Sequence, residues 1–390
     1  GVVRWAVGGG GAKDDFGHAM AVDAQGDIVL VGKFASQVFT ITGGAVSLSR
    51  VPTDPWLGTY SARDPDAFVI KVSSLGTPLW ALGCGGSRYE SAAAVVTSKS
   101  GAVFVAGEYQ SVNTLFGTTY RLRSSGSDWL FRYEVTEGVW VTREDVDIFL
   151  MKMTSAGTVV WVSDSGGLKN EAPTALALSP DEEHVYMTGY FESDVCTFSQ
   201  RMAAYKQQVV LRATGQADAF LLKSAAVRGV PQWAVSAGGE GYDAGLGVAA
   251  DRAGDVYIAG EFTSNATFGD QALAGFNGGG DAFIMKVWQD GSVDFALQMG
   301  GTFFDKSYSL SMVSYVTGGE LLYVTGAFNS GTPADEEHFS TFGQFEQKVF
   351  TTSSGSDLFL SKLMPELVPP PPPAPPPSPH PPPPSPPLPA

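Results

Sequence analysis

The sequence is poor in several residues on which common functions depend. It has 2 cysteines and 4 histidines among 390 residues, and no His-x-x-x-His, Cys-x-x-Cys or Gly-x-Ser-x-Gly pattern. We therefore predict that the chain is not an enzyme and holds no resident cofactor. Positive charge is also scarce, because 24 lysines and arginines face 40 acids, which gives a net charge of −16. This balance argues against nucleic acid or an anionic membrane surface as a partner.

Long hydrophobic runs and helical periodicity are absent as well. No apolar run is long enough to cross a bilayer, so we predict no membrane span. The chain opens on Gly1-Val-Val, which is strand-like and unlike a signal peptide, so we expect a processed or truncated start. Cys84 and Cys196 favour two small buried thiols, with a disulfide between them as the alternative.

What the sequence does have is a repeat. The pattern Asp-x-Phe-x-x-Lys occurs five times, at Asp66–Lys71, Asp147–Lys152, Asp218–Lys223, Asp281–Lys286 and Asp357–Lys362. The surrounding features recur too: a Trp or Phe followed by a glycine pair, an acid four residues later, and a strand that ends in Gly-x-aromatic. A repeat of this kind decides the fold and is interpreted before any local motif.

Each repeat unit contains four short β segments. The fourth unit shows them most simply, at Leu246–Asp251, Asp255–Phe262, Asp281–Val287 and Val293–Met299. Five such units predict an all-β fold, a five-bladed β-propeller over residues 1–364. The chain starts on the Trp strand, which the last unit lacks. We therefore expect Val2–Val7 to pair beside Asp357–Leu363 and close the ring.

The motifs Gly-Gly-x-x-x-Asp, Ala-Val-Asp…Gly-Asp-Val-Tyr-x-x-Gly and Asp-Ala-Phe-x-x-Lys, together with the Trp strand, resemble the SBBP-type β-propeller repeat family. The resemblance covers about residues 1–364 and implies the propeller fold, but it implies no particular function. The third and fifth units depart from the pattern, because Ser179–Glu183 and Val316–Gly319 replace the Asp…Gly-Asp turn.

Residues 365–390 form a second region with a different composition. Val368–Ala390 is nearly all proline, which predicts polyproline II. Its Pro375–Pro379 and Pro381–Pro387 runs resemble the hydroxyproline-rich segments of extensin-like and pherophorin-like cell-wall glycoproteins of plants and green algae. That resemblance implies an extracellular location (cell wall, matrix or cell-surface appendage), prolyl hydroxylation and O-glycans on hydroxyproline. A rigid spacer or an SH3/WW-type ligand would have the same composition.

The expected modification sites follow from this interpretation. In the tail they are Pro371, Pro376, Ser378, Pro382 and Ser385, and a sequon for N-glycosylation stands at Asn265.

The acids that follow the glycine pairs are candidate ligands for a cation. They are Asp15, Glu90, Glu171, Asp243 and Asp305. In a propeller they would lie near the mouth of the central channel, where five carboxylates would bind a cation such as Ca²⁺. The alternative, which we favour, is that each carboxylate caps backbone N–H groups of its own turn or pairs with a repeated lysine.

Aromatic residues of the insertions between the second and third strands are candidate binding residues. They are Trp56, Tyr60, Trp129, Tyr133 and Trp140. We expect them to contact the proline-rich tail of another copy, so that the chain self-associates or joins other matrix glycoproteins. The sequence thus predicts an extracellular structural or assembly glycoprotein. The alternative function is a lectin-like module that binds polysaccharide through these aromatics.

Overall fold

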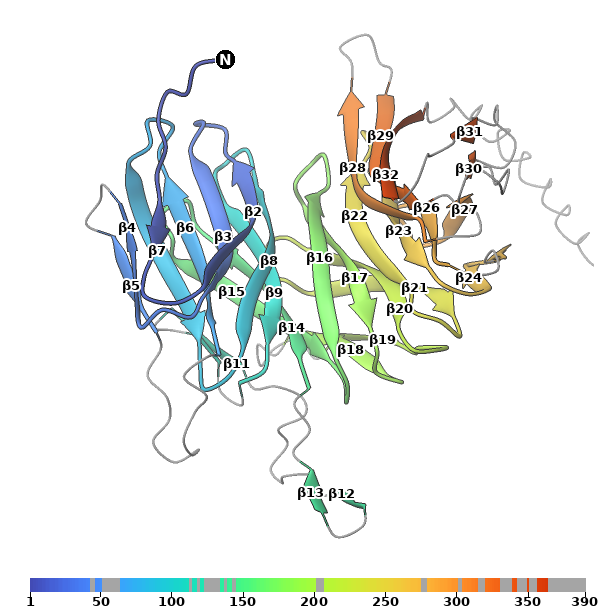
Figure 1. Ribbon diagram of the computed structural model, residues 1–390, viewed down its shortest axis with the longest axis horizontal. Coiled ribbons are helices and arrows are strands. Elements are labelled where there is room, and N and C mark those ends of the chain that lie inside the picture. Colours follow the sequence, from blue (N-terminus) through green and yellow to red (C-terminus); the bar gives the residue numbers. More distant parts are fainter. Residues whose placement is uncertain are drawn as a thin grey trace, which may run out of the picture.

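The computed structural model describes residues 1–42, 46–50, 64–111, 114–117, 120–122, 134–136, 139–141, 145–200, 207–274, 279–300, 304–314, 320–329, 339–341, 349–350 and 356–363. Within these residues the chain is all β, with strands arranged in antiparallel sheets and no helix, as the sequence predicts (Figure 1). No described helix is long and apolar enough to cross a membrane.

Four sheets have six strands each. They contain, in spatial order, β11 (Tyr120–Leu122), β10 (Thr114–Phe116), β7 (Pro78–Gly85), β6 (Asp66–Val72), β3 (Ile28–Phe34) and β2 (Asp15–Val22); β19 (Gln208–Leu211), β18 (Cys196–Ser199), β15 (Val159–Gly166), β14 (Asp147–Met153), β9 (Val103–Tyr109) and β8 (Glu90–Thr97); β16 (Glu171–Leu178), β17 (His184–Phe191), β20 (Asp218–Ala225), β21 (Pro231–Gly239), β24 (Ala266–Phe268) and β25 (Gln271–Leu273); and β22 (Ala244–Ala250), β23 (Val256–Phe262), β26 (Asp281–Val287), β27 (Val293–Gly300), β30 (Phe339–Thr341) and β31 (Val349–Phe350).

The two ends of the array carry three-stranded sheets. One contains β1 (Gly9–Gly10), β4 (Val38–Ile41) and β5 (Ser47–Ser49), and the other contains β28 (Lys306–Ser314), β29 (Glu320–Asn329) and β32 (Ser356–Leu363). A separate hairpin, β12 (Glu134–Thr136) with β13 (Val139–Val141), projects from the second unit (Figure 1).

The repeated motif sets the register inside every unit. The aspartate of Asp-x-Phe-x-x-Lys lies opposite the aromatic residue of Gly-x-aromatic, as in Asp147 opposite Tyr109, and the lysine lies opposite the Trp, as in Lys152 opposite Trp161. The glycine lies opposite the phenylalanine. A Cβ on Gly107 would stand 2.5 Å from the Phe149 ring and 2.2 Å from the carbonyl oxygen of Ser91. Glycine is therefore required there, because the ring occupies the place of a side chain.

The insertions contribute the outer strands, in an arrangement that the sequence does not predict. In the second unit, β10 pairs with β7, which is the fourth strand of the first unit, and β11 pairs with β10. The same relation places β18 and β19 on β15, β24 and β25 on β21, and β30 and β31 on β27. Each unit thus extends the sheet of the unit before it.

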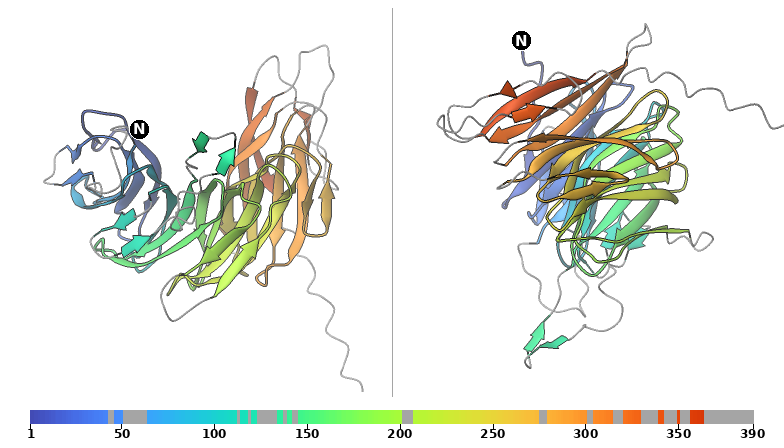
Figure 2. Two further views of the ribbon diagram at one scale, coloured as in Figure 1. Left: turned by 90° about the horizontal axis from the view of Figure 1, so that it is seen from below. Right: turned by 90° about the vertical axis from the view of Figure 1, so that its right-hand side faces the viewer.

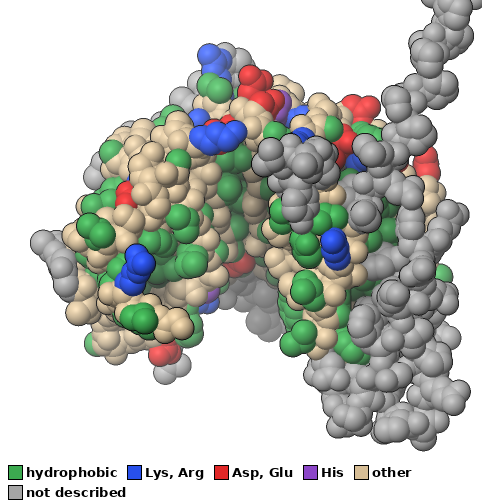
Figure 3. Space-filling view, turned by 90° about the horizontal axis from the view of Figure 1, so that it is seen from above, with side chains coloured by type: hydrophobic (Ala, Val, Ile, Leu, Met, Phe, Trp, Pro, Cys, Tyr) green, Lys and Arg blue, Asp and Glu red, His purple; other side chains and the backbone are tan. Residues whose placement is uncertain are grey.

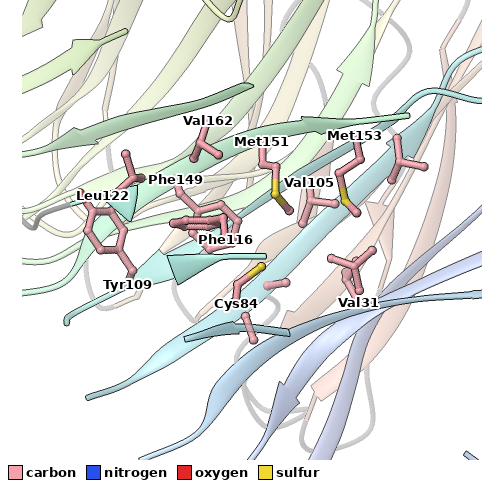
Figure 4. Packing of buried hydrophobic residues seen from close by; sticks show 14 of the residues in the cluster. Val31, Cys84, Val105, Tyr109, Phe116, Leu122, Phe149, Met151, Met153 and Val162 are labelled. Atoms are coloured by element: carbon pink, nitrogen blue, oxygen red, sulfur yellow. The ribbon is translucent and has the colours of Figure 1, made fainter. Parts of the chain in front are cut away.

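Successive sheets pack face to face around apolar layers. The first layer lies between the sheets of the first and second units and includes Val31, Cys84, Phe116, Phe149 and Met151, all fully buried (Figure 4). Equivalent layers follow between later units, and the first strands β2, β8, β16, β22 and β28 adjoin in that order. Cys84 and Cys196 are buried free thiols in two different layers.

A closed ring is not shown. Residues 1–8 form no strand, and in the described residues β32 pairs only with β29. Figures 1 and 2 show the first and last units at opposite ends of a curved array. The sheet of β1, β4 and β5 and the sheet of β28, β29 and β32 are separate, and β28, β29 and β32 correspond to the first three strands of a unit. Closure by Val2–Val7 stays a prediction.

Candidate functional site

The acids after the glycine pairs cap their own turns. Glu171 accepts hydrogen bonds from the backbone N–H of Gly167, at 3.1 Å, and of Ser193, at 3.2 Å. Asp243 does the same for Gly239, at 2.7 Å, and Thr263, at 3.1 Å. These bonds join the glycine pair of one unit to the turn after the second strand of the next unit, which fixes how the two sheets meet.

The first and second acids have the same setting, and the fifth is buried. Asp15 accepts from Gly11 and Ala35, Glu90 accepts from Ser111 and from the Thr114 hydroxyl, and Asp305 is 1% exposed. Within the described ranges there is no group of three or more His, Cys, Asp or Glu residues that could hold a metal ion. The structure therefore supports the capping alternative and does not bring the five predicted carboxylates together as one ligand set.

The glycine pair makes room for two carboxylates. A Cβ on Gly238 would stand 2.7 Å from Oδ1 of Asp218 and 2.7 Å from Oδ2 of Asp243. Burial raises the pKa of Glu90 and of Glu171 to about 8, and that of Asp243 to about 6. The neighbouring aspartates of the repeat, such as Asp218, raise these pKa values further through charge repulsion.

The repeated lysines also have structural partners. Lys71 forms ion pairs with Asp23, at 2.7 Å, and Asp27, at 3.3 Å, in the turn between the first two strands of its unit. Lys223 instead donates to the carbonyl oxygen of Gln289, in the next unit. The lysines of the motif thus stabilise turns within a unit and contacts between units, which agrees with the structural role that its fivefold repetition favours.

The repeated tryptophans join each unit to the next. Trp80 Nε1 donates to the carbonyl oxygen of Ser155, at 3.0 Å, and its ring packs on Gly157, where a Cβ would stand 2.8 Å away. Gly157 has φ of +83°, so glycine also suits the backbone of this turn. Trp161 and Trp233 make the same contact with the turns of the third and fourth units. Trp5 contacts Ser74 in the first unit, as the Trp strand of a preceding blade would.

The predicted binding aromatics are not placed by the structure. Trp56, Tyr60, Trp129 and Tyr133 lie outside the described residues, and so do the tail and its sites Pro371, Pro376, Ser378, Pro382 and Ser385. Trp140 belongs to the hairpin strand β13, but its side chain is outside the described part. Asn265 is exposed, in the turn before β24, where a glycan would find room.

The two ends of the array are unfinished surfaces. Phe16 on β2 is 52% exposed, whereas the equivalent Ser91, Ala172 and Ala244 are buried between units. At the other end, Tyr308 on β28 is 53% exposed and Leu358 on β32 is 80% exposed. Figure 3 shows the molecule hollowed between the two lobes that carry these ends, with hydrophobic side chains on both. Exposed apolar patches of this kind are typical of surfaces that take part in contacts.

Comparison with known proteins identifies no family for this chain. No family model matches the chain, and no curated protein matches it. One solved structure, a protein of unknown function from Dyadobacter fermentans DSM 18053, is similar over 90% of this chain and 97% of its own, with 11% identity and a TM-score of 0.35. At this TM-score the similarity identifies neither the fold nor the function of the chain.

Proposed function

We propose that the chain is a structural protein of an extracellular assembly, in which the five units form a rigid scaffold. The observation that supports this proposal is that the repeated polar residues bond to other parts of the chain. The acids after the glycine pairs cap turns, the lysines neutralise or bond neighbouring turns, and the tryptophans bond the next unit. Repeated groups that are engaged in this way support a scaffold, and contacts with partners then fall to the parts that do not repeat.

The finer architecture of the scaffold is the closed five-bladed propeller. Its closing strand is the segment Val2–Val7, which would lie beside β32 and join the two three-stranded sheets into a fifth six-stranded sheet like the other four. Closure would cover Phe16, Tyr308 and Leu358 together and leave no unpaired edge on β32. A closed ring is a stiff body from which insertions and tail project.

The assembling element is the proline-rich tail. Polyproline II is extended without internal hydrogen bonds, so it presents itself to aromatic grooves at low entropic cost. In this proposal the tail of one copy lies on inserted aromatics of another copy or of another matrix glycoprotein, and head-to-tail contacts of this kind build filaments.

The test compares the full chain with a chain that ends at Met364. A second variant replaces residues 368–390 by a Gly/Ser linker of equal length, which keeps the reach and removes the polyproline II geometry. Light scattering and electron microscopy of the secreted proteins should show assemblies for the full chain alone. Unchanged assembly of both variants would overturn the proposal, while circular dichroism confirms that the scaffold is folded in each.

A further inference from the structure

A row of aromatic and charged side chains crosses the units at one end of their first strands. Several of its members occupy two positions that the repeat leaves variable, namely the residue before a capping acid, as in Tyr89 and Tyr242, and the middle residue of Gly-x-aromatic, as in Lys33, Tyr190 and Glu261. The row has two end sites, one on the first and second units and the other on the fourth and fifth units, and a central site between them.

In both end sites a lysine side chain lies on the faces of aromatic rings and beside a glutamate. Lys33 Nζ lies 5.0 Å from the ring centre of Tyr89, and its charge acts on the neighbouring Glu108. At the other end, Lys306 Nζ lies 4.9 Å from the ring centre of Tyr308 and 3.6 Å from Oε1 of Glu261. Such contacts combine cation–π attraction with an ion pair.

The central site contains aromatic and acidic groups of the same kinds, but among the described residues it has no lysine on its rings. Tyr190, at the end of β17, and Tyr242, before β22, have ring centres 5.3 Å apart and planes inclined at 53°, so the two half-buried rings form a corner. Glu108, Glu192 and Glu261 surround this corner closely enough to raise the pKa of one or both tyrosines, after the larger effect of burial. Among the described residues, no lysine or arginine lies over either ring.

A second observation is that the charge of the Glu261 carboxylate beside the corner is only partly compensated. Glu261 is 5% exposed, and its Oε2 accepts no hydrogen bond from the described residues, although its Oε1 faces Lys306. A buried carboxylate oxygen normally has a donor. An ammonium or guanidinium group offers three or five N–H donors and no acceptor, so it would suit this acidic corner. The net charge of −16 also favours a basic partner.

We propose that the corner formed by Tyr190 and Tyr242 binds the cationic side chain of a lysine or arginine from a basic segment of a partner protein. The end sites illustrate the expected binding mode, in which the cation lies on the face of an aromatic ring and neutralises an adjacent glutamate. This site is separate from the insertions and the tail, so it does not depend on the proposed assembly.

The experiment titrates the full chain with a short lysine peptide and with the same peptide acetylated on the lysine side chain, followed by calorimetry at physiological salt. The acetylated peptide keeps the size and loses the charge, so it should not bind. Tyr242→Leu and Glu192→Gln should each weaken lysine-peptide binding about threefold or more, as expected for one cation–π contact or one ion pair. Tyr242→Phe keeps the ring and should bind nearly as the original chain does.

The matched control is Asp290→Asn. Asp290 lies in the turn after β26, at the opposite end of the strands, and its replacement changes the net charge by the same amount as Glu192→Gln. Equal weakening by the two substitutions would show attraction by the overall acidity and would overturn the site. Equal binding of the acetylated peptide would overturn it as well, and Glu192→Gln retains the test if Tyr242→Leu does not fold.

Discussion

At the scale of the residue, the buried capping acids determine how the scaffold responds to pH. Glu90 is 0% exposed, and burial raises its pKa from 4.5 to about 8. The folded chain therefore holds a proton that the unfolded chain releases above its ordinary pKa. The stabilisation from this group is fully present below pH 4.5 and is lost as the pH rises through about 8.

We accordingly predict that the midpoint of thermal unfolding falls between pH 5 and pH 9, and that Glu90→Gln reduces the fall. Glutamine has no proton to lose, and its oxygen still accepts from the N–H of Ser111. Glu171→Gln should act in the same way, whereas Asp290→Asn, at an exposed turn, should leave the pH dependence as it is. A fall of the same size in the original chain and in Glu90→Gln would contradict this account.

The tryptophan at each seam gives a second prediction at this scale. Trp80→Phe removes the hydrogen bond to Ser155 but keeps a ring on Gly157, so it should cost about 1 kcal/mol of unfolding free energy. Urea unfolding measures the loss. Leu79→Ala, at the neighbouring half-exposed position, should change stability by less than about 0.5 kcal/mol. Equal stability of Trp80→Phe and the original chain would show that the bond contributes nothing.

The repeat makes part of the structure predictable from particular residues. The pair of Phe149 and Gly107 recurs in every unit, and the pair of Lys152 and Trp161 recurs in the first three, so the hexapeptide and its strands were found from the sequence. Caps were favoured over a cation ring, but their partners could not be named, because some of these are backbone N–H groups about twenty residues away, such as that of Ser193. The corner of Tyr190 and Tyr242 was missed because it uses the variable positions; comparing those positions across units would have been the signal.

At the scale of the element, the insertions show the limit of a repeat pattern. Their short outer strands, such as β10 and β24, pair with the unit before them, yet no repeated residue marks this pairing and their lengths differ. The sequence placed the four inner strands of the fourth unit within two residues of β22, β23, β26 and β27. It did not predict β24 and β25. Their pairing depends on which strand of another unit has an unpaired edge, and no repeated residue marks that strand.

The same register gives a prediction for the unpaired edge of β32. In the first unit Lys71 lies opposite Trp80 and Val69 lies opposite Leu82. By the repeat, Lys362 should lie opposite Trp5, and Leu360 opposite Val7. We predict that Val7→Cys with Leu360→Cys forms a disulfide within one molecule, visible by intact mass and as a monomer on a non-reducing gel.

The control pair shifts the register. Val7→Cys with Leu358→Cys places the second thiol on the same face but two residues along the strand, where bridging should be slower and less complete. A disulfide found only in dimers would mean that the segment of residues 2–8 joins β32 of another copy. Absence of any disulfide in the first pair would remove the proposed closure.

At the scale of the whole molecule, apolar layers between successive sheets bind the units into one array. The layers include fully buried groups such as Phe149 and Met151 between the first two units, and Ile284 and Val324 between the last two. A fifth cluster, which includes Phe34 and Phe39, packs the sheet of β4 and β5 on the first unit, whereas Phe16 and Tyr308 at the two ends of the array are exposed. Three of the seams between units repeat the hydrogen bond of a tryptophan to the next unit, and the seam after the fourth unit has Phe295 in its place.

The last prediction concerns the tail, whose chemistry decides where such a scaffold works. If the chain is an extracellular glycoprotein, the native protein should carry hydroxyproline and attached pentose or hexose between Val368 and Ala390. Mass spectrometry of the intact protein and of its peptides measures both additions. Peptides from the buried strand β26 serve as the internal control and should be unmodified, while the peptide that contains the exposed Asn265 tests secretion independently. An unmodified tail together with an unmodified Asn265 would contradict the extracellular location, but it would leave the scaffold and the cation-binding corner unaffected, since these depend on the folded units alone.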